Sequence, residues 1–348
     1  MNKIQVDQIK KIKKLLSEKR KIVITTHNNP DGDAIGSSMA LYHFLIKHGH
    51  KVDAIVPNMY PQFLAWIPGV SKMIVYENKS AKAQTLLAQA EIVFCLDYNA
   101  IHRTGSLADI LERTEAKRIL IDHHIDPETD SFDYCISTVD TSSTAELVYN
   151  FIQHLGGLEF IDKPIAESLY AGIVTDTGSF SFSCNNNETF EVTADLIGRG
   201  VDAQKLHRLI YDTFSESRLR LLGYAIHNRM IVWEEFNTAL IYLTKADLKK
   251  FDYQVGDTEG IVNYPLNMEK INLSILLTEK EKMIRMSFRS KGKFSVNDFV
   301  RKHFNGGGHM NAAGGKSFTT IEKTIENVKA VLPVYKKDLD YVLSYKSK

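Results

Sequence analysis

Histidine and aspartate side chains gather in one short segment, HNNPDGDAIGS, at residues 27–37. His27, Asp31 and Asp33 lie close together in it, and the proline and glycine among them favour a tight turn. Two carboxylates two residues apart, with an imidazole nearby, can reach two adjacent cations. The alternative is that one aspartate merely caps a helix beginning at Ala34. Capping needs only one of them and leaves His27 unexplained, so the pattern favours metal binding.

Further acidic and imidazole side chains occur where apolar stretches end. They are Asp97 after EIVFCL, Asp122, His123 and His124 after KRILI, and Asp176 after GIVT. Each of them alone could be an ordinary turn residue. Burying a carboxylate or an imidazole beside an apolar segment is costly unless the group is paired or binds a cation. Their repetition therefore indicates a single functional site.

Alternating strand-like and helical segments must position these groups. The apolar runs KIVITT, HKVDAIV, MIVY, EIVFCL and KRILI are separated by helical stretches. This alternation predicts right-handed crossovers and an α/β fold, with a doubly wound, mostly parallel sheet and helices on both faces. The carboxyl ends of parallel strands meet at one edge of such a sheet. We therefore expect His27, Asp97 and Asp122 to lie near one another.

The ligand types favour hard divalent cations. Carboxylates and imidazoles without thiolates suit Mn²⁺ or Mg²⁺ better than a structural zinc. Two such ions about 3.5–4 Å apart are a common device for phosphoester hydrolysis, because they activate water and stabilise charge on the phosphoryl oxygens. The residues thus predict a two-metal phosphoesterase.

Composition limits the classes of function. A chain of 348 residues with 44% apolar and 24% charged residues suits two globular domains. A formal net charge of +1 argues against a protein that tracks long nucleic acid. Cys95, Cys135 and Cys184 form no paired motif, which fits a reducing compartment. No apolar run resembles a signal peptide or a membrane span, so we expect a soluble, cytoplasmic protein.

The pattern of the chain changes in its second half. We expect a catalytic domain at 1–187, a helical connector at 188–230 and a smaller domain at 231–348. This last segment holds the strand-like runs ALIYLT, INLSILLT and MIRMSFRS, a helix near 296–303, the glycine-rich stretch FNGGGHMNAAGG and a closing helix. It predicts a smaller α/β domain with a mixed sheet.

In this order the motifs resemble those of the DHH phosphoesterases. The resemblance rests on DGD at 31–33, on Asp97, on DHH at 122–124 and on TDTGSF at 175–180. The stretch at 304–315 looks like the glycine-rich motif of that family's DHH-associated C-terminal domain. The matching motifs run from His27 to Gly315, which is nearly the whole chain.

The resemblance implies roles for single residues. One metal ion would be held by His27 and Asp31, the other by Asp33, His123 and Asp176, with Asp97 bridging both. Asp122 would orient an imidazole, and His124 would assist proton transfer to the leaving oxygen. The catalytic residues would then be Asp97, Asp122, His123 and His124. Adjacency in the sequence does not tell which of the two histidines binds metal.

Substrate contacts are expected in both domains. The glycine-rich stretch could offer backbone N–H groups to a phosphate, and the alternative is a flexible surface turn. Arg289 matches an FRS pattern of the family by resemblance, and a guanidinium binds phosphate bidentately. For Ser143 a helix cap is at least as good an interpretation. The expected set is Arg103, Ser143, Arg289, Gly306, Gly307, Gly308 and His309.

Within the family, the chain resembles the stand-alone nanoRNase/pAp phosphatases. That resemblance implies Mn²⁺-dependent hydrolysis of short oligoribonucleotides and of nucleotide bisphosphates such as 3′-phosphoadenosine 5′-phosphate (pAp), with no long duplex and no membrane as partner. A stand-alone phosphodiesterase for cyclic di-AMP or its linear product pApA is the first alternative. A nucleotide sensor without turnover is the second, and it would require a broken metal set. The oligomeric state is left open, with a homodimer among the options.

Overall fold

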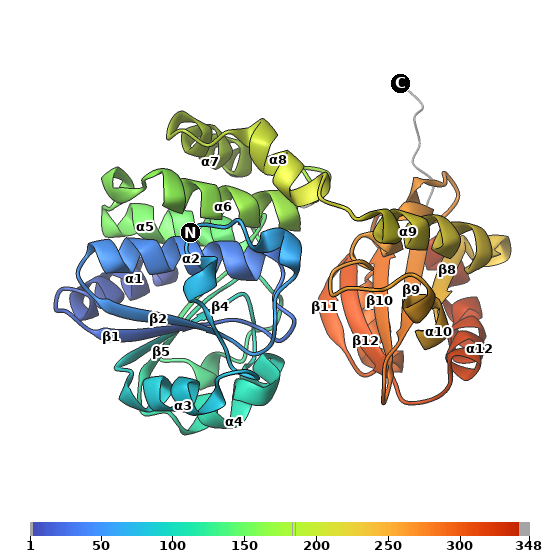
Figure 1. Ribbon diagram of the computed structural model, residues 1–348, viewed down its shortest axis with the longest axis horizontal. Coiled ribbons are helices and arrows are strands. Elements are labelled where there is room, and N and C mark those ends of the chain that lie inside the picture. Colours follow the sequence, from blue (N-terminus) through green and yellow to red (C-terminus); the bar gives the residue numbers. More distant parts are fainter. Residues whose placement is uncertain (1–2, 183, 185, 341–348) are drawn as a thin grey trace. The chain divides into compact units, whose positions relative to one another are not determined.

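The protein forms two compact units, Met1–Thr213 and Phe214–Lys348, in a computed structural model that describes residues 3–182, 184 and 186–340 (Figure 1). The expected connector at 188–230 is not a separate element. Its first two helices, α7 (Asn187–Gly198) and α8 (Ala203–Tyr211), bury Leu196 and Leu206 in the core of the first unit. The third, α9 (Glu216–Asn228), buries Leu221 in the second unit, so the division falls between α8 and α9.

A six-stranded parallel sheet forms the centre of the first unit, as predicted. The strand order is β3-β2-β1-β4-β5-β6, and successive strands progress in opposite directions on the two sides of β1. Such a switch leaves a crevice beyond the carboxyl ends of β1 and β4. The strands are β1 (Lys21–Thr25), β2 (Lys51–Val56), β3 (Ile74–Val75), β4 (Ile92–Leu96), β5 (Lys117–Asp122) and β6 (Tyr134–Ser137).

Helices cover both faces of this sheet because its central strands carry apolar side chains on both sides. All five residues of β4 are buried, which is the pattern of a strand between two helical layers. One face packs against α2 (Gly32–Lys47) and α5 (Thr144–Leu155), and α6 (Lys163–Asp176) packs on these two helices. The other face packs against α3 (Ser80–Gln89) and α4 (Ala108–Arg113) (Figure 1).

The helix α1 (Lys3–Leu15) lies along the edge strand β6, which was not among the predicted strands. The side-chain amide of Gln5 donates a hydrogen bond to the carbonyl of Ser137, at 2.6 Å. The backbone N–H of Cys135 donates to the side-chain carbonyl of Gln8. Two glutamine side chains thus occupy backbone groups at the outer edge of β6.

Glycines allow α2 and α6 to approach closely. A Cβ atom on Gly36 would lie 2.5 Å from the carbonyl oxygen of Ser168, and one on Gly172 would lie 2.5 Å from the Cβ of Ala145. The same Cβ on Gly172 would come within 2.9 Å of a carboxylate oxygen of Asp33. This contact therefore fixes the distance between helices that carry candidate site residues.

The second unit contains a mixed six-stranded sheet in the order β11-β12-β10-β9-β8-β7, which confirms the predicted mixed sheet. Neighbouring strands are antiparallel except β8 and β9. One face packs against α11 (Val296–His303) and α12 (Ile321–Val331), and the other packs, over β8 and β9, against α9 and α10 (Lys245–Lys250). The strands are β7 (Met230–Trp233), β8 (Thr238–Leu243), β9 (Leu273–Glu279), β10 (Ile284–Ser290), β11 (Gly307–His309) and β12 (Ala312–Ser317), and α13 (Lys336–Leu339) is the last helix described.

No helix within the described residues combines the length and the apolar character that crossing a bilayer requires.

The packing of α2 on α6 predicts opposite effects for two glycine substitutions. Gly36→Ala should lower the free energy of unfolding by about 1–3 kcal/mol, because the new methyl group must displace the backbone of α6. The matched control is Gly223→Ala on α9, where an added Cβ has no neighbour within 4 Å. The control should raise stability by about 0.5–1 kcal/mol, because alanine favours helix. Urea unfolding of both full-length variants measures the difference, and equal stabilities would show that the close approach is not required.

Candidate functional site

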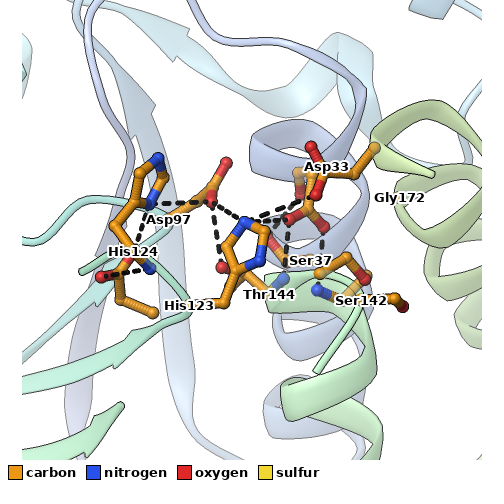
Figure 2. A network of polar contacts seen from close by, with 12 residues as sticks. Asp33, Ser37, Asp97, His123, His124, Ser142, Thr144 and Gly172 are labelled. Atoms are coloured by element: carbon orange, nitrogen blue, oxygen red, sulfur yellow. Dashed lines mark hydrogen bonds and ion pairs between the residues drawn. The ribbon is translucent and has the colours of Figure 1, made fainter. Parts of the chain in front are cut away.

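The candidate site lies at the carboxyl ends of β1, β4 and β5, where the sequence placed it. His27 follows β1, Asp97 follows β4 directly, and Asp122 is the last residue of β5. Asp97 adopts a positive φ of 64°, a conformation that is uncommon outside glycine. Its backbone N–H donates to the carbonyl of Ile121 on β5, which ties the two strand ends together. Figure 2 shows Asp97 and His123 directed toward Asp33 of α2.

Asp31 and Asp33 each accept hydrogen bonds at the start of a different helix. One oxygen of Asp31 caps α2 by accepting from the N–H groups of Asp33 and Ala34, both at 3.1 Å. The carboxylate of Asp33 accepts from the first N–H groups of α5, those of Thr144 at 2.7 Å and Ala145 at 2.8 Å. The cap and metal interpretations are therefore compatible, because each carboxylate retains further lone pairs.

His123 lies at the centre of the carboxylates. Its Nε2 atom is 3.8 Å from Asp33, 3.6 Å from Asp97 and 3.5 Å from Asp176 (Figure 2 shows the first two). Burial by itself would lower the pKa of His123, but the negative charges of Asp176 and Asp97 raise it above the usual value. His123 therefore faces three candidate ligands at once.

His27 contacts a second group of acids. Its Nε2 atom lies 3.4 Å from Asp97 and 3.8 Å from Asp31, while Nδ1 is 2.9 Å from the carbonyl of Asn28. Burial alone would lower the pKa of this histidine. The nearby carboxylates of Asp31 and Asp97 outweigh burial and raise the pKa of His27 to about 10. Asp97 thus stands between the two histidines.

The charge balance of the cluster suits divalent cations. Burial and repulsion from Asp97 and Asp176 raise the pKa of Asp33 well above its ordinary value. A cation relieves such repulsion between carboxylates. Three ligand sets share Asp97, and the ligand atoms of each set lie within 4.8 Å of one another. They are His27, Asp31 and Asp97; Asp33, Asp97 and His123; and Asp97, Asp122 and His124.

His124 is held differently from His123. Its Nδ1 atom lies 2.7 Å from one oxygen of Asp122, and its backbone N–H donates to the other at 3.0 Å. Burial lowers the pKa of His124 well below the usual value, and the positive charge of Arg103 adds to the effect. Arg103 itself lies in the turn Ile101–Leu107 and donates to Asn99 at 3.4 Å. Asp122 therefore orients the His124 ring, and Arg103 lies near that ring.

Asp176 ends α6, as predicted, and a tight turn follows it. Three consecutive residues, Gly178, Ser179 and Phe180, have positive φ angles of 54°, 58° and 64°. The buried hydroxyl of Thr177 donates to the carbonyl of Ile173 and accepts from the N–H of Phe180. A left-handed conformation is costly for non-glycine residues, so these bonds hold a strained turn next to a candidate ligand.

In the second unit, Arg289 and His309 lie on one face of the sheet. Arg289 on β10 pairs with Ala312 on β12, and Ala312 pairs with His309 on β11. Directly opposed residues of antiparallel strands point to the same face, so the two longer side chains flank a small one. The exposed Arg285 and Lys316, another opposed pair, lie on that face too. This part of the face is basic and lined by small residues.

The glycine-rich stretch and Ser143, both expected to contact substrate, have defined structural roles. Residues 307–309 form the edge strand β11 and not a loop, and the N–H of Gly308 donates to Asn297 at 2.9 Å. The glycines are required because a Cβ on Gly306 would collide with the carbonyl oxygen of Gly314. Ser143 is completely buried and its hydroxyl accepts from the N–H of Glu146 as the cap of α5. The alternative interpretation of Ser143 as a helix cap is the one that the structure shows.

The sequence did not single out Thr144, which follows Ser143 in the run of hydroxyl residues TSSTAE. The hydroxyl of Thr144 donates to Asp97 at 3.0 Å, in addition to its N–H bond to Asp33 (Figure 2). The run itself was visible, but four neighbouring hydroxyl residues give no sequence signal for the one that faces the acids.

Two family models match the chain. The model of the DHH family, N-terminal domain, matches residues 21–173, and that of the DHHA1 domain matches residues 237–334.

Relatives match over most of the chain. A bifunctional oligoribonuclease and PAP phosphatase NrnA of Thermus thermophilus is 31% identical, over 84% of this chain and 83% of the relative. The protein of that name from Bacillus subtilis is 28% identical, over 86% and 90%. The crystal structure of an exopolyphosphatase-related protein from Bacteroides fragilis is 42% identical, covers 98% of this chain and 100% of that one, and superposes with a TM-score of 0.92. The matched N-terminal domain spans the strand ends that carry the acids and histidines. This chain therefore belongs to the DHH family, and it carries a DHHA1 domain after the catalytic unit.

Proposed function

We propose that the protein is a Mn²⁺-dependent phosphoesterase that hydrolyses short oligoribonucleotides to mononucleotides and converts pAp to AMP. The observation that carries this proposal is the convergence of carboxylates and imidazoles around Asp97. The names of the Thermus thermophilus and Bacillus subtilis relatives, each an oligoribonuclease and PAP phosphatase, support the choice of substrate.

The proposed metal ligands fall into two sets. His27, Asp31 and Asp97 would hold one ion, and Asp33, Asp97, His123 and Asp176 the other, with Mg²⁺ as the alternative to Mn²⁺. Their oxygen and imidazole donors match what these ions prefer. When bound, two such ions activate water and stabilise the charge on the phosphoryl oxygens.

Other residues of the first unit would orient and assist. Asp122 holds the His124 ring by its Nδ1 atom, so that the ring has one orientation beside Asp97. His124 would assist proton transfer to the leaving oxygen. Arg103 would contact the phosphoryl group with its guanidinium.

The basic face of the second unit would bind the remainder of the substrate. Arg289 would clamp a phosphate, and His309 would contact the same end of the nucleotide from two strands away. The small residues at 306–308 and Ala312 allow a ligand to approach the backbone. Because β11 is a strand, the backbone groups there are partly committed, and side chains carry most of the recognition.

A side-by-side rate comparison tests the proposal. The purified full-length protein is incubated with Mn²⁺ and pAp, pApA, cyclic di-AMP or oligoribonucleotides of two to five residues. We expect AMP from pAp and mononucleotides from the short oligoribonucleotides. Preferential cleavage of cyclic di-AMP would favour the cyclic-dinucleotide alternative, and binding without any turnover would favour a sensor.

Asp97→Asn should abolish turnover without unfolding the protein. Asparagine has the same shape and tolerates a positive φ, but it is a poor bridging ligand. Turnover of pAp should fall below about one per cent of the wild-type rate, the loss expected when two-metal charge stabilisation fails. The metal-free variant should remain folded by circular dichroism, because the loss of repulsion against Asp33 offsets part of the lost attraction to His27 and His123. Turnover of more than a few per cent would contradict the bridging role.

His309→Ala should act mainly on substrate binding. Its side chain belongs to the second unit, so its loss should raise KM for pAp by about 10-fold, the equivalent of one lost charge-assisted hydrogen bond, with little change in kcat. The matched control is His227→Ala, an exposed histidine on α9 of the same unit, which should leave both constants unchanged. Steady-state kinetics distinguish the outcomes, and a large fall in kcat at constant KM would count against the assignment.

A further inference from the structure

Thr144 contacts two carboxylates that come from different elements. Its backbone N–H donates to Asp33 on α2 at 2.7 Å, and its hydroxyl donates to Asp97 after β4 at 3.0 Å (Figure 2). The hydroxyl must be the donor, because an ionised carboxylate only accepts. Thr144, Asp33 and Asp97 are 0%, 1% and 2% exposed, so water does not substitute for these bonds.

The two hydrogen bonds restrict the rotation of both carboxylate groups. A carboxylate can rotate about its last side-chain bond, and rotation moves the lone pairs away from a metal ion. Asp97 is also flanked by His27 and His123, and Asp33 is repelled by the surrounding acids. One residue that bonds to both carboxylates sets their orientation relative to each other.

Thr144 is itself held rigidly. The preceding residue, Ser143, caps α5, the helix that Thr144 begins. The following residue, Ala145, packs against Gly172 of α6. One oxygen of the completely buried Glu146 accepts from the hydroxyls of Ser142 and of Thr189 on α7. The first turn of α5 is thereby anchored to α6 and α7.

We infer that Thr144 is a positioning residue that holds Asp33 and Asp97 in the orientation needed to bind the two metal ions. The inference rests on the proposed two-metal function. Thr144 contacts the ligands and not the ions, and hydrogen-bond partners of metal ligands commonly contribute 10–100-fold to metal affinity. Its N–H holds Asp33 whatever the side chain, and its hydroxyl, not its methyl group, holds Asp97.

The test distinguishes the effect of the Thr144 hydroxyl from the effect of its side-chain volume. Thr144→Val removes the hydroxyl at similar size and keeps the N–H, whereas Thr144→Ser keeps the hydroxyl. Calorimetric titration of the metal-free full-length proteins with Mn²⁺ should show at least one site weakened about 10–100-fold in the valine variant. The serine variant should bind close to wild type. With pAp as substrate, kcat should fall in the valine variant while KM stays within about twofold.

Thr324→Val is the matched control, because its buried hydroxyl bonds only within the second unit among the contacts described. It should leave Mn²⁺ affinity unchanged, and thermal melting of all metal-free variants reports on the fold. If the valine variant does not fold, Thr144→Ala takes its place with the same expected loss of affinity.

Three results would overturn the inference. Wild-type Mn²⁺ affinity in Thr144→Val shows that the hydroxyl does not position the ligands. Equal losses in the valine and serine variants assign the effect to packing. A wild-type protein that binds no Mn²⁺ in this titration overturns both the inference and the proposed function, whereas the first two results leave the proposed function intact.

Discussion

Mutual repulsion between buried carboxylates is the constraint on which the first unit depends. Burial and the neighbouring acids both disfavour the charge on Asp33, and Asp97 must adopt a left-handed backbone to join the group. Two helix N-termini offset part of this repulsion, since α2 donates N–H groups to Asp31 and α5 to Asp33. The tightly packed helices and the buried sheet supply the stability that keeps such a cluster folded.

The different tasks of the two units explain why their sheets differ. Ligands that must keep fixed distances sit at the ends of parallel strands and at the starts of helices, which are rigid points of a doubly wound sheet. The face proposed to bind substrate has another requirement, namely room for a ligand between Arg289 and His309. Small residues on neighbouring antiparallel strands provide it.

Much of this could be predicted from the sequence. Apolar runs that end in Asp or His located β1, β4 and β5, and the alternation with helices gave the parallel sheet. The strand β6 was missed because YCIS is short and only half-buried. β11 and β12 were missed because glycine is unfavourable in strands in general and is required here only by the close approach of two backbones. Whether Ser143 or Thr144 faces the acids depends on the exact start of α5, which sequence patterns locate only to within a few residues.

The glutamines on α1 have a consequence for how the first unit folds during its synthesis. An open strand edge invites pairing with other chains, above all while a large parallel sheet is still incomplete. Gln5 and Ser137 are 132 positions apart, so the segment that covers the edge leaves the ribosome long before the strand that needs it. The edge can thus be covered as soon as β6 pairs with β5, and the backbone groups of Cys135 and Ser137 are then not open to pairing with another chain.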